Sequence, residues 1–163
     1  MQKKERFGLP TLDEGLAKLQ RYCAYQDRCH KEVREKLSDL GIWGDDAGEI
    51  MVALIEEKFL DEERFARSFV RGKHRFKKWG RIKIKIELKK KDITGYCLKM
   101  GFQEIEDDEY LQTLTTLLEK KVKLVKAKND YERKSKLARF AMTKGYESNL
   151  VWQVVNELIP VTK

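Results

Sequence analysis

Residues 61–93 read DEERFARSFVRGKHRFKKWGRIKIKIELKKKDI and account for the positive charge of this chain. From Arg64 to Lys91 the stretch contains 13 lysines and arginines and a single acid, Glu87, a local excess of +12. The whole chain of 163 residues has a net charge of +8, so the residues outside this segment carry a net −4. The basic character is therefore confined to one central segment, a pattern typical of proteins that bind a polyanion.

The first half of this stretch predicts an amphipathic helix. Asp61 is a favourable N-cap, and Glu62 and Glu63 place negative charge in the first turn, where the helix dipole is positive. Apolar residues then recur at helical spacing and form one face, made of Phe65, Ala66, Phe69 and Val70. Basic residues occupy the other side, so we expect one face in the core and one in solvent.

The second half is ambiguous, because residues 82–88 alternate between apolar and charged side chains as a half-buried strand does. No second alternating run is present to pair with such a strand. An internal repeat favours a helix instead. It aligns Val33, Leu37 and Ile42 with Ile84, Leu88 and Ile93 at an offset of 51 residues, and more weakly with Leu137, Ala141 and Tyr146 a further 53 along. We therefore predict a helix over 80–91, with Ile84 and Leu88 buried and Ile82 and Ile86 exposed.

Cap signals and apolar stripes predict further helices on both sides of the basic segment. Thr11 with Glu14, and Asp46 with Glu49, form capping-box patterns, and Gly41 is a natural helix end. The pattern predicts nine helices and no strand. The expected fold is all-α, an elongated, curved array of three tandem three-helix repeats. The predicted division is a flexible N-terminal tail at 1–11, followed by helical repeats at 12–60, 61–105 and 106–163.

Composition excludes several classes of protein. No apolar run approaches the roughly 20 residues that cross a bilayer, and the first residues lack the apolar stretch of a secretory signal, so we expect a cytoplasmic protein. The cysteines, Cys23, Cys29 and Cys97, form no CxxC pair, which argues against a disulfide framework. A zinc site built on Cys23, Cys29 and His30 lacks a fourth ligand at suitable spacing. We expect no metal, no cofactor and no catalytic residues.

Two motifs in the central segment resemble the RecX family of recombinase regulators. They are D-E-E-R-F-A-x-x-F-V-R at 61–71 and W-G-R-I-K-I-K-I-E-L at 79–88, closed by Ile93. The positions that match the central repeat of that family are Arg64, Phe65, Arg71, Gly80, Lys83, Lys85 and Lys89. Arg81 and Asp92 depart from the family pattern, which has Pro and Gly there, but neither change removes a basic group. Asp also tolerates the left-handed conformation that such a turn requires.

The resemblance implies a function without catalysis. A protein of this family binds the RecA–DNA nucleoprotein filament and inhibits filament extension, ATPase activity, strand exchange and SOS co-protease activity. The implied partners are the RecA filament and single-stranded and double-stranded DNA, with no membrane and a monomeric chain. Charge alone leaves two alternatives open, a stand-alone, sequence-nonspecific nucleic-acid-binding helical repeat protein and a helical scaffold for an acidic protein.

The candidate partner- and DNA-binding residues lie on the basic faces, where like charges repel unless a polyanion neutralises them. They are Arg64, Arg67, Arg71, Arg75, Lys77, Lys78, Trp79, Arg81, Lys83, Lys85 and Lys89. The plainer alternative is an ordinary solvated face. Trp79 either makes a contact, by stacking on a base or seating against protein at an interface, or anchors the packing of helices. Ile82 and Ile86 either form a protein interface or pack between adjacent repeats.

Overall fold

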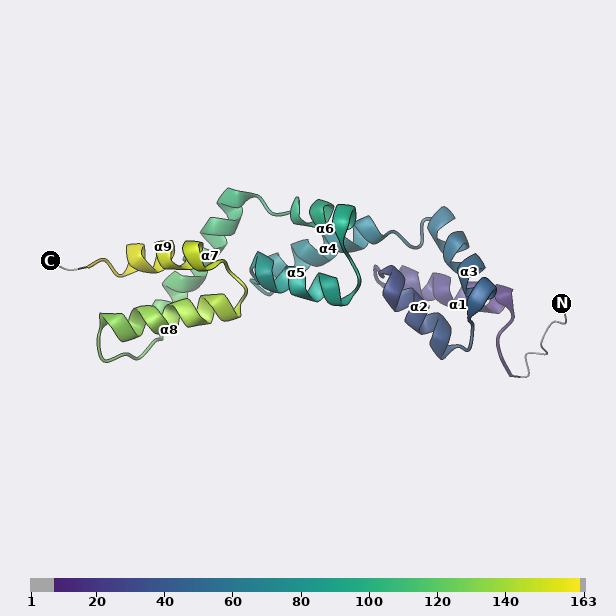
Figure 1. The fold of residues 1–163 in the computed structure, drawn as a ribbon, viewed down its shortest axis with the longest axis horizontal. Helices are drawn as coiled ribbons and strands as arrows, with labels where there is room; N and C mark the ends of the chain where they lie inside the picture. Colours follow the sequence, from purple (N-terminus) through teal and green to yellow (C-terminus); the bar gives the residue numbers. More distant parts are fainter. Residues whose placement is uncertain (1–7, 162–163) are drawn as a thin grey trace.

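The structure, a computed structural model, describes residues 8–161 and contains nine α-helices and no strand in that range. The helices are α1 (Leu12–Tyr25), α2 (His30–Asp39), α3 (Gly44–Glu56), α4 (Glu62–Arg75), α5 (Arg81–Lys90), α6 (Gly95–Phe102), α7 (Asp107–Val122), α8 (Asp130–Thr143) and α9 (Ser148–Leu158). They follow one another along an elongated molecule, with α1 to α3 at one end and α7 to α9 at the other (Figure 1). The all-α prediction is confirmed. No helix in 8–161 is long and apolar enough to cross a membrane.

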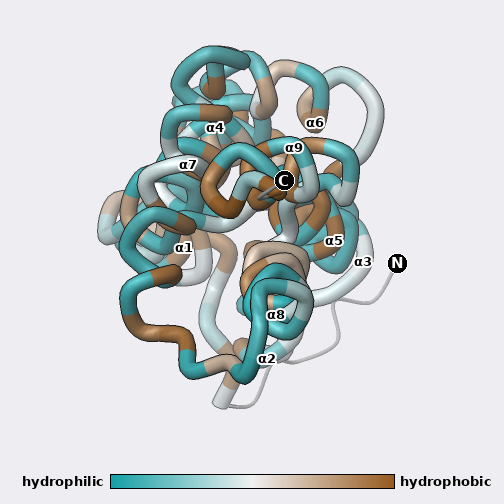
Figure 2. Tube along the Cα trace, turned by 90° about the vertical axis from the view of Figure 1, so that its left-hand side faces the viewer, coloured by the Kyte–Doolittle hydropathy of each residue, from teal (hydrophilic) through white to brown (hydrophobic). Residues whose placement is uncertain are grey.

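The buried side chains form two hydrophobic cores. The first lies within α1, α2 and α3 and includes Leu19, Val33 and Leu54, each 0% exposed. The second is continuous through α4 to α9 and includes Ile84 and Leu114. Hydrophobic and hydrophilic positions alternate around the helices when the molecule is viewed end-on, as amphipathic helices require (Figure 2). The repeat boundaries at 60/61 and 105/106 stay a proposal, and residues 1–7 of the predicted tail lie outside the described part of the chain.

The repeat register predicted from sequence reappears in the backbone. The aligned residue after each second helix donates its N–H to a carbonyl five residues earlier: Ile42 to Leu37 (2.9 Å), Ile93 to Leu88 (3.0 Å) and Tyr146 to Ala141 (3.2 Å). The residue before each donor has a positive φ: Gly41 (75°), Asp92 (58°) and Gly145 (98°). This is the Schellman arrangement, in which a left-handed residue ends a helix. Asp92 therefore adopts the left-handed conformation for which the family pattern has glycine.

The alternating isoleucines belong to a helix and not to a strand. Within α5, Ile84 and Leu88 are 0% exposed, whereas Ile82 and Ile86 are 47% and 50% exposed. A separation of four residues places Ile84 and Leu88 on one side of a helix, and both enter the core of α4 to α9. The helix predicted over 80–91 and its burial pattern are both confirmed.

Two of the predicted helix starts are confirmed and one is wrong. Thr11 Oγ1 accepts from Glu14 N at 3.2 Å and completes a capping box, and Asp61 Oδ1 accepts from Arg64 N at 3.0 Å. Asp46 is no N-cap, because α3 begins at Gly44 with Trp43 as the N-cap. The left-handed turn at Gly41 reverses the chain within a few residues, so α3 begins at Gly44, two residues before Asp46.

Candidate nucleic-acid and protein interface

The amino end of α5 is fixed by the last turn of α8. Gly80 N donates to Lys144 O at 2.7 Å, and Ile82 N donates to Gly145 O at 3.0 Å. A Cβ on Gly80 would lie 2.3 Å from the carbonyl carbon of Gly145, so only glycine allows this approach. The carbonyls at the end of α8 thus satisfy N–H groups at the start of α5, and the dipoles of the two helices are favourably aligned. The start of the basic helix α5 is therefore bonded to the third group of helices, α7 to α9.

The arginines of the basic segment are already engaged in ion pairs. Arg64 contacts Asp27 of the loop before α2 through its Nε at 2.9 Å, and its Nη1 and Nη2 donate to the carbonyls of Lys58 and Phe59 at 3.1 Å each. These bonds hold α4 against the first group of helices, α1 to α3, at the junction between the two cores. Arg64 is 43% exposed, yet most of its donors serve the protein itself.

A second set of ion pairs joins α4 to the segment that leads into α7. Arg67 contacts Glu63 at 3.1 Å and Glu104 at 3.2 Å, and Arg71 contacts the same Glu104 at 3.3 Å. The hydrogen bonds that Arg67 donates to Glu63 and Glu104 raise the pKa of Arg67 above its usual value. Arg75 lies 3.7 Å from a carboxylate oxygen of Glu109.

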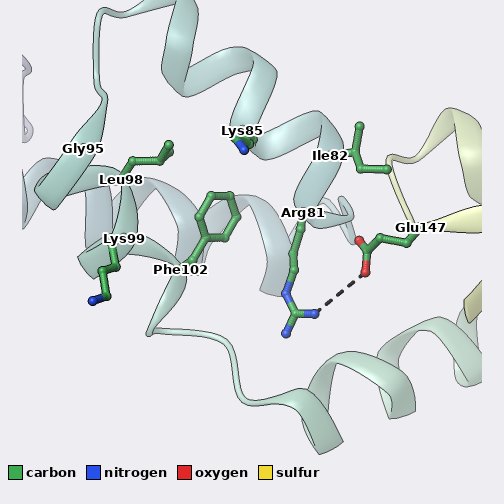
Figure 3. A pocket seen from close by; sticks show the side chains of 8 residues that line it. All are labelled: Arg81, Ile82, Lys85, Gly95, Leu98, Lys99, Phe102 and Glu147. Atoms are coloured by element: carbon green, nitrogen blue, oxygen red, sulfur yellow. Dashed lines mark ion pairs between the residues drawn. The ribbon is translucent and has the colours of Figure 1, made fainter.

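Arg81 belongs to a polar cluster between α5, α7 and the start of α9. Its guanidinium contacts Asp107 at 2.6 Å and Glu147 at 3.8 Å, the latter contact being visible in Figure 3, and it lies 4.0 Å over the ring of Tyr110. The Tyr110 hydroxyl donates to Glu147 at 2.5 Å and accepts from Arg81 N at 3.0 Å. Burial, and then this bond to Glu147, raise the pKa of Tyr110. The cluster holds the second and third groups of helices together.

Five of the candidate residues are lysines without such partners in residues 8–161; Lys73, outside the candidate set, also has none there but lies over the rings of Phe69 and Trp79. No carboxylate of residues 8–161 lies within 4.0 Å of the ammonium groups of the five candidates; we call them the free lysine set: Lys77, Lys78, Lys83, Lys85 and Lys89. All but the half-buried Lys83 are exposed. They lie just beyond the end of α4 and along α5. Uncompensated ammonium groups on one rigid segment can contact successive phosphates without reading bases.

The segment itself contains one acid in 28 residues, but acids that are distant in sequence also lie against it. Acids from other parts of the chain neutralise the arginines, namely Asp27, Glu104, Asp107, Glu109 and Glu147. Lys90 and Lys91 are paired with Glu87 and Glu32, whereas the free lysine set has no carboxylate partner in residues 8–161. The structure separates the candidate residues into arginines that stabilise the fold and lysines that are available for a ligand.

Trp79 packs as an anchor. It is half-buried against the core of α4 to α9, and the ammonium groups of Lys73 and Lys83 lie 4.9 Å and 4.5 Å from its ring centroid. Its carbonyl is bound to Nδ1 of the buried His74 at 3.0 Å. These contacts favour the packing alternative for Trp79 and leave little ring surface for a base.

Phe76 is the aromatic residue that sequence reasoning missed. It follows α4, is 85% exposed and stands between Arg75 and Lys77. The signal that could have identified it is a phenylalanine within a run of cations, shortly before Trp79 and Gly80. An exposed ring beside cations suits stacking on an unpaired base.

Ile82 and Ile86 are half-exposed on α5 and are not buried between groups of helices. Ile82 lines a groove of about 490 Å³ between α5 and α6, together with Leu98 and Phe102. That these isoleucines form a protein interface stays a prediction. The groove would be the location of that interface, and Ile82 is the isoleucine that lines it.

The described part of the chain offers no site for a metal ion. No group of three or more His, Cys, Asp or Glu side chains within 8–161 is arranged to hold a metal ion. Cys23 and Cys29 are buried, Cys97 is half-buried, and burial raises the pKa of the Cys29 thiol to about 11. His30 pairs with Glu62 at 3.5 Å.

Comparison with known proteins identifies the helical groups. The profile of the second three-helix domain of RecX matches residues 61–99, and that of the third matches residues 107–155. A regulatory protein RecX of Clostridium perfringens is 30% identical over 133 residues, which are 80% of this chain and 62% of the relative. The chain thus spans less than two thirds of that protein. A regulatory protein RecX of Prosthecochloris aestuarii is 28% identical over 138 residues, 85% of this chain and 89% of the relative.

A solved structure has the same fold. The crystal structure of RecX from Lactobacillus salivarius superimposes with a TM-score of 0.83 at 26% identity and covers 92% of this chain and 97% of that chain. The agreement extends over all three groups of helices, because only a small part of the chain lies outside the match.

Proposed function

Since the chain belongs to the RecX family of regulatory proteins, we propose that it is a non-enzymatic regulator that binds the RecA–DNA nucleoprotein filament. In this proposal binding lowers filament extension, ATPase activity, strand exchange and SOS co-protease activity. The partners are the recombinase and DNA, single-stranded above all, and the chain acts as a monomer in the cytoplasm.

The observation that carries the proposal is the free lysine set. A phosphate backbone inside a filament offers evenly spaced negative charges, and the five ammonium groups lie on one segment, in which Gly80 N and Ile82 N are hydrogen-bonded to the end of α8. If all five contact phosphates of a single strand, the logarithm of the affinity falls against the logarithm of salt with a slope of about −3.5. Such contacts give affinity without sequence preference, as a regulator of filaments on any DNA needs.

The paired arginines have a supporting part in the proposal. Arg64 connects the second group of helices to the first, and Arg81 connects it to the third, whereas Arg71 pairs within the second group. A rigid array loses less conformational entropy on binding than a flexible one. The elongated shape of the molecule suits contact with several recombinase protomers at once (Figure 1).

A titration of recombinase ATP hydrolysis on single-stranded DNA tests the proposal. We expect inhibition at amounts well below one chain per recombinase protomer, because a bound chain blocks extension past its position. Equal rates with and without an equimolar amount of the chain would overturn the proposal.

The same lysines support a second candidate, a stand-alone nucleic-acid-binding protein. Tight, salt-sensitive binding to DNA combined with no response of the recombinase would favour it. Binding to an acidic protein with no affinity for DNA would favour a helical scaffold.

A further inference from the structure

The groove between α5 and α6 is apolar inside and basic at its rim. Figure 3 shows Leu98 and Phe102 pointing from α6 into the space beside α5, where Ile82 closes the far side. The side chains of Leu98 and Phe102 are only partly buried by the core below them. With a volume of about 490 Å³, the groove has room for one or two large side chains of another molecule.

The charges around the groove are unbalanced. Lys85 and Lys99 are exposed, and no carboxylate of residues 8–161 lies within 4.0 Å of either ammonium group. The nearest acid of the lining is Glu147, which is already bound by Arg81 and by the Tyr110 hydroxyl. A ligand of this groove must therefore bring its own negative charge to balance the two lysines.

We propose that this groove is the protein-docking site of the chain and binds an acidic segment of a partner protein. One bulky apolar side chain of that segment rests on Ile82, Leu98 and Phe102, and its carboxylates face Lys85 and Lys99. The inference rests on the proposed function, because it assigns the protein half of an interaction whose DNA half is assigned to the free lysine set; Lys85 lies at the border of the two sites and belongs to both.

The composition of the groove separates it from a DNA site. Phosphate gains nothing from an apolar floor, and an aliphatic and aromatic lining gains affinity only by burying apolar surface. An acidic peptide with one large apolar residue can bury that residue against the apolar lining and place its carboxylates next to the lysines of the rim. Apolar anchors in pockets surrounded by polar contacts are the usual arrangement at protein interfaces.

Fluorescence anisotropy with labelled synthetic peptides tests this inference. The probe is a short peptide with a central phenylalanine flanked on both sides by glutamates. Two matched peptides carry serine in place of the phenylalanine, or glutamines in place of the glutamates. We expect the full chain to bind the probe and to bind each matched peptide at least about tenfold more weakly.

Two variants place the binding in the groove. Ile82→Ser and Lys99→Gln are each expected to weaken binding of the probe about tenfold. Ile82→Ser should keep the circular dichroism spectrum and the affinity for single-stranded DNA of the unchanged chain. The matched control is Val52→Ser, which removes an exposed apolar side chain on α3 that is 53% exposed, and it should bind the probe normally.

In the peptide assay the inference is overturned by the absence of saturable probe binding, by equal binding of all three peptides, or by normal binding of the probe to Ile82→Ser. Self-association of the chain in sedimentation velocity that Ile82→Ser abolishes would assign the groove to a second copy and also overturn it. Full inhibition of the recombinase by Ile82→Ser would contradict docking in the groove and leave the proposed function intact. Failure of the unchanged chain to inhibit would instead refute the proposed function.

Discussion

The division between paired arginines and free lysines predicts that two variants with the same loss of charge behave differently. The lysine variant replaces Lys83, Lys85 and Lys89 by glutamine, and the arginine variant replaces Arg64, Arg71 and Arg75 by glutamine. Each loses three positive charges. In the structure the lysines have no carboxylate partner within 8–161, whereas the arginines contact Asp27, Glu104 and Glu109.

The expected magnitudes follow from these contacts. Loss of three phosphate contacts to a single strand reduces the slope of log affinity against log salt by about 2. The arginine variant keeps those contacts, so its slope stays close to that of the unchanged chain. It loses three exposed ion pairs, which together stabilise the fold by roughly 1–2 kcal/mol, and its Tm falls by roughly 3–6 °C.

The assay is fluorescence anisotropy of labelled oligothymidine at several salt concentrations, with thermal unfolding followed by circular dichroism. The lysine variant should show the smaller salt slope and an unchanged Tm. The reasoning is refuted if the arginine variant loses as much salt slope as the lysine variant, because the ion-paired arginines would then be DNA contacts.

Phe76→Ala should weaken binding of single-stranded DNA roughly tenfold, since stacking on one base contributes about 1–3 kcal/mol, whereas Phe76→Tyr keeps the affinity; equal affinity of both variants excludes stacking. Gly80→Ala should lower the free energy of unfolding in urea by several kcal/mol, on the order of overpacking or more, because its Cβ meets the Gly145 backbone at 2.3 Å. Gly72→Ala should raise the free energy of unfolding by about 1 kcal/mol, because a Cβ there meets nothing within 4 Å. Equal effects of Gly80→Ala and Gly72→Ala would contradict the close contact between Gly80 and Gly145. Tyr110→Phe should cost about 0.5–1.5 kcal/mol of stability, because the partly exposed Glu147 carboxylate and the backbone N–H of Arg81 lose a partner; an unchanged unfolding curve argues against that network.

The helical elements were predictable because their determinants are local. Thr11, Asp61 and Gly41 act within a few residues of their own position, and the structure confirms all three. The helix α5 was predictable only through the internal repeat. Its own alternation favours a strand, and the competing requirement to bury Ile84 and Leu88 decides the outcome.

The pairing of the arginines was not predictable, because their partners are distant in sequence. Glu104 lies 37 residues after Arg67, and Glu147 reaches Arg81 only once α8 has docked against α5. The groove likewise exists only after α6 packs beside α5. A sequence scan finds the basic residues of such a site but not the tertiary contacts that decide which of them are free.

The start of α3 shows a limit of local patterns. Asp46 with Glu49 has the spacing of a capping box, yet the left-handed turn at Gly41 sets the chain into a helix from Gly44 onward. A cap signal is therefore overridden when the preceding turn fixes the direction of the chain.

The most direct test of the central claim is inhibition of recombinase ATP hydrolysis by a charge-reversed chain. Lys83, Lys85 and Lys89 are replaced together by glutamate, and the matched control carries the same change at Lys120, Lys123 and Lys126, which are exposed on the third group of helices. The proposal predicts that the first variant loses inhibition while its helicity is unchanged, and that the control inhibits as the unchanged chain does. Normal inhibition by the first variant would show that the free lysine set is not the site.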